Sequence, residues 1–221
     1  MPTAWKTLKK VIQELLKHWQ NCSPSPKGRL KLTPPRNSFI FSKFEIMSEL
    51  LTKPETMVDI YRLLPEGTPV QVINNHLYMS PAPNVPHFRI VSSLSDQFRR
   101  IVRESGLGEV FFAPVDVYLG DKNAIQPDVF YISNENAHII KEDAVYGSPD
   151  LIVEVLSPGN KKADLVKKKA IYEEFGIKEY FIVNPADRSV ITYYLENKTY
   201  IEQKLQKGKL ISKLLNAEIA F

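Results

Sequence analysis

The sequence predicts an α/β protein with a central mixed β-sheet, one long helix before the sheet and one helix inside it. Apolar residues recur at helical spacing through residues 87–108, and three β-branched or aromatic runs follow between turn residues. A strand, helix and strand succession then covers residues 150–184, which is the pattern of a parallel crossover. With 221 residues, 43% of them hydrophobic, the chain is long enough for one sizeable core.

Two short elements are expected before the long helix. The segment PETMVDIYRLL predicts a helix with Pro54 in its first turn. The segment PVQVINNHLYMS predicts two strands joined at Asn74 and Asn75, because asparagine tolerates the positive φ of a tight hairpin turn.

The long helix is expected in HFRIVSSLSDQFRRIVRESGLG, where an apolar stripe ends at Gly106 and Gly108. Three strands should follow: EVFFAPVDVYL, AIQPDVFYIS and DLIVEVL.

The second half of the core begins with the helix ADLVKKKAIYEEFG, closed by Gly176, and the strand EYFIVN. DLIVEVL and EYFIVN should therefore be parallel neighbours. The segment SVITYYLENKTYIEQ predicts a hairpin that turns at residues 196–198, and KLISKLLNAEIAF predicts only a weakly defined tail.

The composition of the chain changes near residue 46. Residues 1–46 hold five of the sixteen prolines and nine basic against two acidic side chains, a net charge of +7 that predicts a disordered extension. The predicted domain covers residues 47–205, and residues 206–221 form a tail that packs on it or follows it. The remaining 175 residues carry 20 basic and 23 acidic side chains, so net charge gives no argument that the domain binds nucleic acid.

The single cysteine, Cys22, excludes an internal disulfide framework and fits a reducing compartment. No apolar run approaches the roughly 20 residues of a membrane span, so we expect a cytoplasmic protein without stable membrane association. Residues 5–19 alternate between apolar and basic positions and could form a helix on a membrane surface. In the competing interpretation, translation starts at Met47 and the upstream segment has no function.

The strand DLIVEVL carries two carboxylates within an apolar run. Alternation places Asp150 and Glu154 on one face but roughly 13 Å apart, too far to share one ion. Asp150 follows a Ser-Pro turn and is expected to cap it. A buried carboxylate without a partner costs several kcal/mol, so Glu154 needs a partner from another element.

Asp128 is the predicted partner, because it begins the preceding strand and neighbouring strands lie about 4.8 Å apart. A metal bound by Asp128 and Glu154 would suit phosphodiester hydrolysis, and Mg²⁺, or Mn²⁺ in its place, fits so sparse a ligand set. Asp116 either joins this site or faces solvent at a sheet edge. The alternative for the two carboxylates is a structural ion pair, with Lys168 as the cation.

Lys168 is the predicted cation over the end of the Glu154 strand. It shares a helical stripe with Asp164 and Tyr172, so a salt bridge to Asp164 is an equal alternative, and Tyr172 is either core packing or accessory to the site. Four further lysines of this helix either contact a nucleic-acid backbone or form a solvated face. They are Lys161, Lys162, Lys167 and Lys169.

Several stretches together resemble one family. They are INNHLYMSPAPNVPH, GLGEVFFAPVDVYL, IQPDVFYIS, SPDLIVEVLSPGN, ADLVKKKAIYEEFG and IKEYFIVNP. In this order, over residues from about 53 to 203, the chain resembles the Uma-type putative restriction endonucleases of the PD-(D/E)xK nuclease superfamily. The resemblance implies a restriction-endonuclease-like αβββαβ core and metal-dependent cleavage of DNA, with Asp128 and Glu154 as the two halves of the motif. It also places His87 near the site, although packing at the helix start explains this residue equally well.

Two positions depart from the superfamily pattern. Leu156 stands where the superfamily usually has its lysine, which makes Lys168 the expected substitute, and Gln71 stands where many members carry a glutamate. The sequence therefore predicts a divalent-metal-dependent DNA endonuclease, as a monomer or a homodimer. The alternative is a catalytically inactive protein of the nuclease fold that binds nucleic acid or a protein partner.

Overall fold

The computed structural model describes residues 54–65, 67–80, 82–157 and 162–221, with the backbone alone for residues 162–165. The extension predicted for residues 1–46 and the alternative start at Met47 lie outside these residues. Within the described part, no helix is long and apolar enough to cross a membrane.

The main β-sheet contains the strands that carry the predicted site. Its order is β11 (Thr199–Glu202), β10 (Ser189–Glu196), β9 (Glu179–Val183), β8 (Leu151–Val155), β6 (Val129–Ser133) and β3 (Gly108–Phe112), and β12 (Gln206–Lys207) also pairs with β10. Neighbouring strands are antiparallel except β8 and β9, which are parallel and joined through helix α5 (Lys162–Glu174). The predicted crossover and the predicted β10–β11 hairpin are both confirmed.

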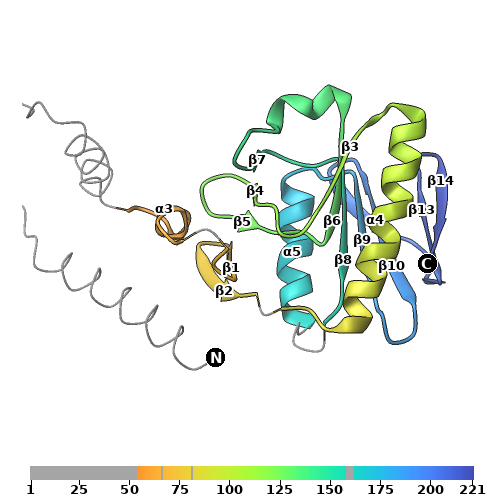
Figure 1. Cartoon of the computed structure of the whole chain (residues 1–221), viewed down its shortest axis with the longest axis horizontal. Helices are drawn as coiled ribbons and strands as arrows, with labels where there is room; N and C mark the ends of the chain where they lie inside the picture. Colours follow the sequence, from red (N-terminus) through yellow and green to blue (C-terminus); the bar gives the residue numbers. More distant parts are fainter. Residues whose placement is uncertain (1–53, 66, 81, 158–161) are drawn as a thin grey trace, which may run out of the picture. The chain divides into compact units, whose positions relative to one another are not determined.

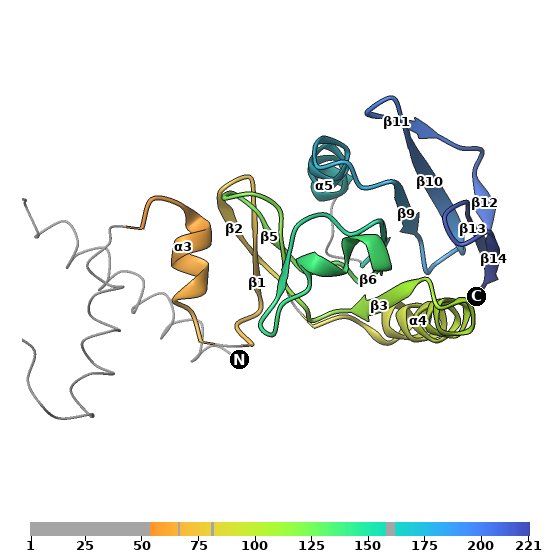
Figure 2. The ribbon, with the colours of Figure 1, turned by 90° about the horizontal axis from the view of Figure 1, so that it is seen from above.

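Two helices cover opposite faces of this sheet (Figure 2). Phe130 and Ile152 point to the face covered by α5, where they share a cluster with Tyr172. Val129 and Val153 point to the face covered by α4 (Val85–Ser105). The succession α4, β3, β6, β8, α5 and β9 is the predicted αβββαβ core.

Helix α4 begins and ends where the sequence indicates. The Asn84 side chain accepts a hydrogen bond from the His87 backbone N–H at 3.0 Å, and Gly106 closes the helix with φ of 63°. The first predicted helix, α3 (Met57–Arg62), is capped by Thr56. Pro54 therefore precedes the helix and is not in its first turn, contrary to the prediction.

Two predicted strands are each divided between two sheets. EVFFAPVDVYL forms β3 in the main sheet and β4 (Val117–Tyr118) in a second sheet, and AIQPDVFYIS forms β5 (Ala124–Ile125) and β6. Each division falls at a proline, Pro114 or Pro127, which has no backbone N–H to donate to a ladder. The sequence interpretation treated each run as continuous and was wrong on this point.

The second sheet has the order β2 (His76–Met79), β1 (Val70–Ile73), β5, β4 and β7 (Val145–Tyr146). The predicted hairpin of β1 and β2 is present, with φ of 49° at Asn74 and 61° at Asn75. Between β6 and β7 lies a short 3₁₀ helix, η1 (Asn134–Ile139).

The C-terminal residues form an ordered hairpin of β13 (Lys209–Ser212) and β14 (Ala217–Ala220), which lies beside α4 (Figure 1). Leu210 and Ile219 are fully buried in the same cluster as Leu94 and Phe98 of α4. The segment expected as a weakly defined tail thus contributes to the core.

Candidate active site

The pairing of β6 with β8 brings Asp128 and Glu154 together. Val129 pairs with Val153 and Phe130 with Ile152, so the same register places Asp128 opposite Glu154. Residues directly opposite in an antiparallel pair have their side chains on the same face, with Cβ atoms about 5 Å apart. Both carboxylates therefore lie at one end of the β6–β8 pair.

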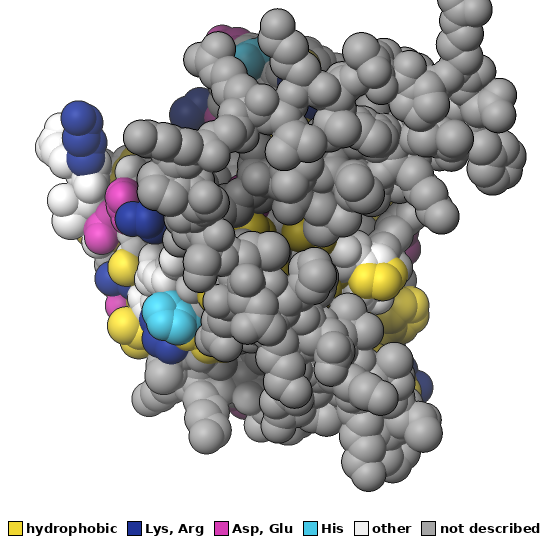
Figure 3. All heavy atoms as spheres, turned by 90° about the vertical axis from the view of Figure 1, so that its left-hand side faces the viewer, with side chains coloured by type: hydrophobic (Ala, Val, Ile, Leu, Met, Phe, Trp, Pro, Cys, Tyr) yellow, Lys and Arg dark blue, Asp and Glu magenta, His cyan; other side chains and the backbone are white. Residues whose placement is uncertain are grey.

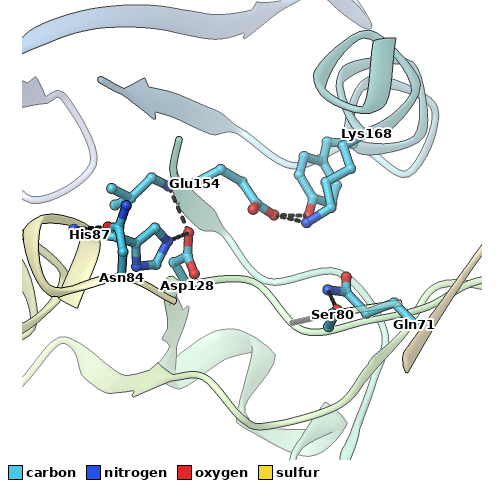
Figure 4. A network of polar contacts seen from close by, with 9 residues as sticks. Gln71, Ser80, Asn84, His87, Asp128, Glu154 and Lys168 are labelled. Atoms are coloured by element: carbon cyan, nitrogen blue, oxygen red, sulfur yellow. Dashed lines mark hydrogen bonds and ion pairs between the residues drawn. The ribbon is translucent and has the colours of Figure 1, made fainter. Parts of the chain in front are cut away.

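Asp128 is held by two donors on one oxygen. Its Oδ2 accepts a hydrogen bond from the Val155 backbone N–H at 2.7 Å and another from His87 Nε2 at 3.2 Å (Figure 4). The side chain of His87 is 8% exposed and that of Asp128 is 17% exposed. Burial lowers the pKa of His87, but the Asp128 and Glu154 carboxylates outweigh burial and raise this pKa.

Glu154 is also held by two donors on one oxygen. Its Oε1 accepts hydrogen bonds from Lys168 Nζ and from the Tyr172 hydroxyl, each at 2.7 Å. Lys168 and Tyr172 are four residues apart on α5 and therefore lie on one face of that helix. In Figure 4 the Glu154 carboxylate lies between Asp128 and Lys168. Lys168 is thus paired with Glu154, and the side chain of Asp164 is not among those described.

The surroundings of Glu154 act on its charge in opposite directions. Burial raises the pKa of Glu154, the Lys168 ammonium opposes this effect, and the nearby Asp128 carboxylate raises the pKa further. The net shift is upward. The charged form of Glu154 therefore depends on a cation close by.

Within the described part of the chain, each of the two carboxylates has one oxygen without a protein donor, which we call its open oxygen. Among the described residues, neither Asp128 Oδ1 nor Glu154 Oε2 takes part in a hydrogen bond. The described part of the chain contains no group of three or more His, Cys, Asp or Glu side chains that could hold a metal ion. A pair of open carboxylate oxygens nevertheless fits Mg²⁺ or Mn²⁺, since Mg²⁺ keeps several waters and takes one or two protein carboxylates.

Asp116 lies in a separate network on the second sheet. Its Oδ1 accepts hydrogen bonds from the Tyr61 hydroxyl at 2.7 Å and from Gln126 Nε2 at 2.8 Å. Gln71 contacts the same segment, because its Oε1 accepts from the Gln126 backbone N–H and its Nε2 donates to Ser80. Asp116 is half-buried and hydrogen-bonded, so it neither contacts the paired carboxylates nor simply faces solvent at an edge.

The other predicted lysines have varied surroundings. Lys167 Nζ donates a hydrogen bond to the Tyr78 hydroxyl at 2.9 Å, and Lys169 Nζ lies 4.6 Å from the centre of the Tyr193 ring. Lys161 and the side chain of Lys162 are outside the described part. On the face shown in Figure 3, the visible basic and acidic side chains of the described residues are interspersed.

Sequence reasoning missed three groups around the site. Asn84, two residues before Pro86, positions His87 at the start of α4, and a helix-capping signal could have identified it. The Val155 backbone N–H and the Tyr78 hydroxyl gave no comparable signal, because their partners come from distant parts of the chain.

The fold and the paired carboxylates define a protein of the restriction-endonuclease-like class. Residues 57–220 match the model of the Uma2 family, described as "Putative restriction endonuclease", and the chain belongs to this family. A crystal structure of a "putative nuclease belonging to DUF820" from Anabaena variabilis ATCC 29413 is similar, with a TM-score of 0.61 and 17% sequence identity. The match covers 74% of this chain and 92% of that chain, and it supports the fold. No curated protein matches the chain.

Proposed function

We propose that this protein is a divalent-metal-dependent endonuclease that hydrolyses phosphodiester bonds in DNA. The observation that carries the proposal is the arrangement of Asp128 and Glu154, opposite each other on paired strands. Each has one oxygen held by protein donors and one oxygen that no described residue bonds. Membership of a family described as restriction endonucleases supports DNA as the substrate.

The two open oxygens, Asp128 Oδ1 and Glu154 Oε2, would hold Mg²⁺ or Mn²⁺. When bound, such an ion polarises the scissile phosphate and lowers the pKa of a bound water. His87 and the Val155 backbone N–H fix the orientation of Asp128 through its other oxygen. Ligands whose orientation is fixed in advance bind metal more tightly than mobile ones.

Lys168 supplies the positive charge at the reacting phosphate. A lysine ammonium has three N–H donors, and the bond to Glu154 uses one of them. The remaining donors can orient the attacking water and bind a phosphate oxygen as negative charge develops there.

The departure at Leu156 is consistent with this assignment. Leu156 packs against the apolar cluster beneath α5, on the face of the strand that also carries Glu154. Lys168, a residue of helix α5, instead brings its ammonium group to Glu154 at the end of the strand. Lys168 thus takes the place of a lysine two positions after the glutamate.

The test is cleavage of supercoiled plasmid DNA with Mg²⁺ or Mn²⁺ by wild type, Glu154→Gln and Glu179→Gln. Glu179 is a matched control, because it is an equally buried glutamate on the neighbouring strand β9 and lies outside the site. We expect Glu154→Gln to lower the cleavage rate by about 100-fold or more, since it removes a metal ligand. Glu179→Gln should cleave at close to the wild-type rate.

Equal cleavage by wild type and Glu154→Gln would contradict the proposal. So would the absence of cleavage of plasmid DNA, single-stranded DNA and RNA with either metal. Calorimetric titration with Mn²⁺ then separates the alternatives. A metal site binds Mn²⁺ and loses it on Asp128→Ala, whereas a non-catalytic protein with a structural Glu154–Lys168 pair binds none.

A further inference from the structure

The hydroxyl group of Tyr172 has a role beyond packing. We infer that Tyr172 is a positioning residue for Glu154, whose hydroxyl holds Oε1 against α5 so that Oε2 stays open to the metal ion while Lys168 also contacts the substrate. This inference rests on the proposed nuclease function and deepens it.

The first support is the burial of the bond. Tyr172 is fully buried, and its hydroxyl donates to Glu154 Oε1 at 2.7 Å. A buried hydroxyl has no water as an alternative partner, so rotation of the Glu154 carboxylate away from it would leave a donor unpaired. The bond therefore favours a single orientation of the carboxylate.

The second support is the rigidity of the tyrosine compared with the lysine. The Tyr172 ring packs edge-on against Tyr180, with ring centres 5.0 Å apart, in the cluster beneath α5. Lys168 carries its ammonium on a flexible four-carbon stem and can exchange one oxygen partner for another. Of the two donors on Oε1, Tyr172 is therefore the one that fixes the position of Glu154, while Lys168 shares its N–H donors between Glu154 and a phosphate.

Tyr180 offers a matched control for the hydroxyl. Like Tyr172 it is fully buried in the same cluster, but its hydroxyl has no hydrogen-bond partner in the described part of the chain. Tyr172→Phe and Tyr180→Phe thus remove the same group from neighbouring rings. Only the first of them removes a bond to Glu154.

The experiment is calorimetric titration of the full chain with Mn²⁺ in the absence of DNA, with thermal unfolding measured in parallel. Tyr172→Phe should weaken Mn²⁺ binding by about 10-fold, because groups that orient metal ligands typically contribute 10- to 100-fold to affinity. Tyr180→Phe should bind Mn²⁺ as wild type does. In plasmid cleavage, a saturating Mn²⁺ concentration should restore most of the activity of Tyr172→Phe, which loss of the fold would not allow.

Equal Mn²⁺ affinities for Tyr172→Phe and Tyr180→Phe would overturn the inference and leave the proposed function standing. A Tyr172→Phe protein that does not fold would also overturn it, since the hydroxyl would then support the fold and not the ion site. A wild-type protein that neither binds Mn²⁺ nor cleaves DNA would overturn the proposed function itself. The outcomes are therefore distinguishable.

Discussion

Glu154 on β8 and Glu179 on β9 are both almost fully buried, at 4% and 2% exposed, but their oxygens are bonded differently. Glu179 Oε2 accepts from the Ser212 hydroxyl, and Oε1 accepts from the backbone N–H groups of Lys213 and Leu214. Both oxygens of Glu179 are thus satisfied by the turn of the C-terminal hairpin. Glu154 has two donors on one oxygen and, among the described residues, none on the other.

This difference in hydrogen bonding distinguishes a carboxylate that stabilises the fold from one that is available for chemistry. Asp150 resembles Glu179, because its Oδ1 accepts from Asn136 and Lys178 and its Oδ2 accepts from the Ser133 backbone N–H. Asp150 was expected to cap the Ser-Pro turn before it, but its donors come from the end of β6, from η1 and from Lys178, so that expectation was wrong although its role is structural. Burial alone does not distinguish the two kinds of carboxylate, but the bonding of the second oxygen does.

The largest stability effect is expected from Lys168→Met. The substitution leaves Glu154 buried without its cation, which should lower the free energy of unfolding at pH 7 by about 3–5 kcal/mol. The pKa of Glu154 is already raised, so its protonated form is favoured in the folded state and the loss should shrink as the pH falls. Urea denaturation at pH 5 and pH 7 measures both effects. A small loss, independent of pH, would show that Glu154 does not need this charge.

Glu179→Ala should have the next largest effect. It leaves the Ser212 hydroxyl and two backbone N–H groups unpaired, and we expect a loss of about 3 kcal/mol in unfolding free energy. Glu179→Gln should recover most of that loss, since an amide can still accept from the backbone and donate to Ser212. Urea denaturation of the two variants checks this. If Glu179→Ala lowered Mn²⁺ affinity without changing stability, the comparison with Glu154 would fail.

The pH dependence of stability should differ between Asp150 and Glu179. Burial raises the pKa of Asp150, but Lys178, Ser133 and Asn136 outweigh burial and hold this pKa below its ordinary value of 3.8. Asp150 therefore stabilises the fold above pH 3.8, and this contribution is lost as the pH falls through its lowered pKa. Asp150→Asn should lose less stability on acidification than wild type does.

Glu179 should behave in the opposite way. Burial raises the pKa of Glu179, and its hydrogen bonds oppose this effect without cancelling it. The folded state therefore favours the protonated form of Glu179. The stability that Glu179 contributes to the fold is lost as the pH rises through its raised pKa. Glu179→Gln should therefore flatten the decline of stability above pH 4.5, the ordinary pKa of the group. Chemical denaturation between pH 3 and pH 7 tests both variants, and parallel curves for the two would contradict the assignment.

Much of the core could be predicted because its signals are local. Period-two alternation placed Ile152 and Glu154 on one face of β8, and the structure has Ile152 and Tyr172 in one cluster beneath α5. The strand, helix and strand succession fixed β8 and β9 as parallel neighbours. The spacing of neighbouring strands named Asp128 as the partner carboxylate of Glu154, and the register of β6 and β8 brings the two residues opposite each other.

The errors arose where tertiary pairing decides the outcome. A run such as AIQPDVFYIS has strand composition throughout, and only its pairing with two different sheets divides it at Pro127. The C-terminal hairpin depends on Leu210 and Ile219 meeting α4, which lies more than 100 residues earlier in the chain. The donors on each carboxylate oxygen depend on side-chain geometry, which spacing in the sequence does not determine.

The smallest effect, from Lys178→Met, gives the sharpest contrast with Lys168. Lys178 Nζ lies 2.7 Å from Asp150 Oδ1, the same distance that separates Lys168 from Glu154, but its side chain is 50% exposed against 8% for Lys168. Asp150 also keeps Asn136 and the Ser133 N–H when the lysine is removed. Although Asp150 is buried, solvent screens the half-exposed ammonium, so we expect a loss of about 1 kcal/mol, and urea denaturation at low and high salt measures it. A loss as large as that of Lys168→Met would mean that Asp150 also depends on one cation, and open oxygens would no longer mark the functional carboxylate.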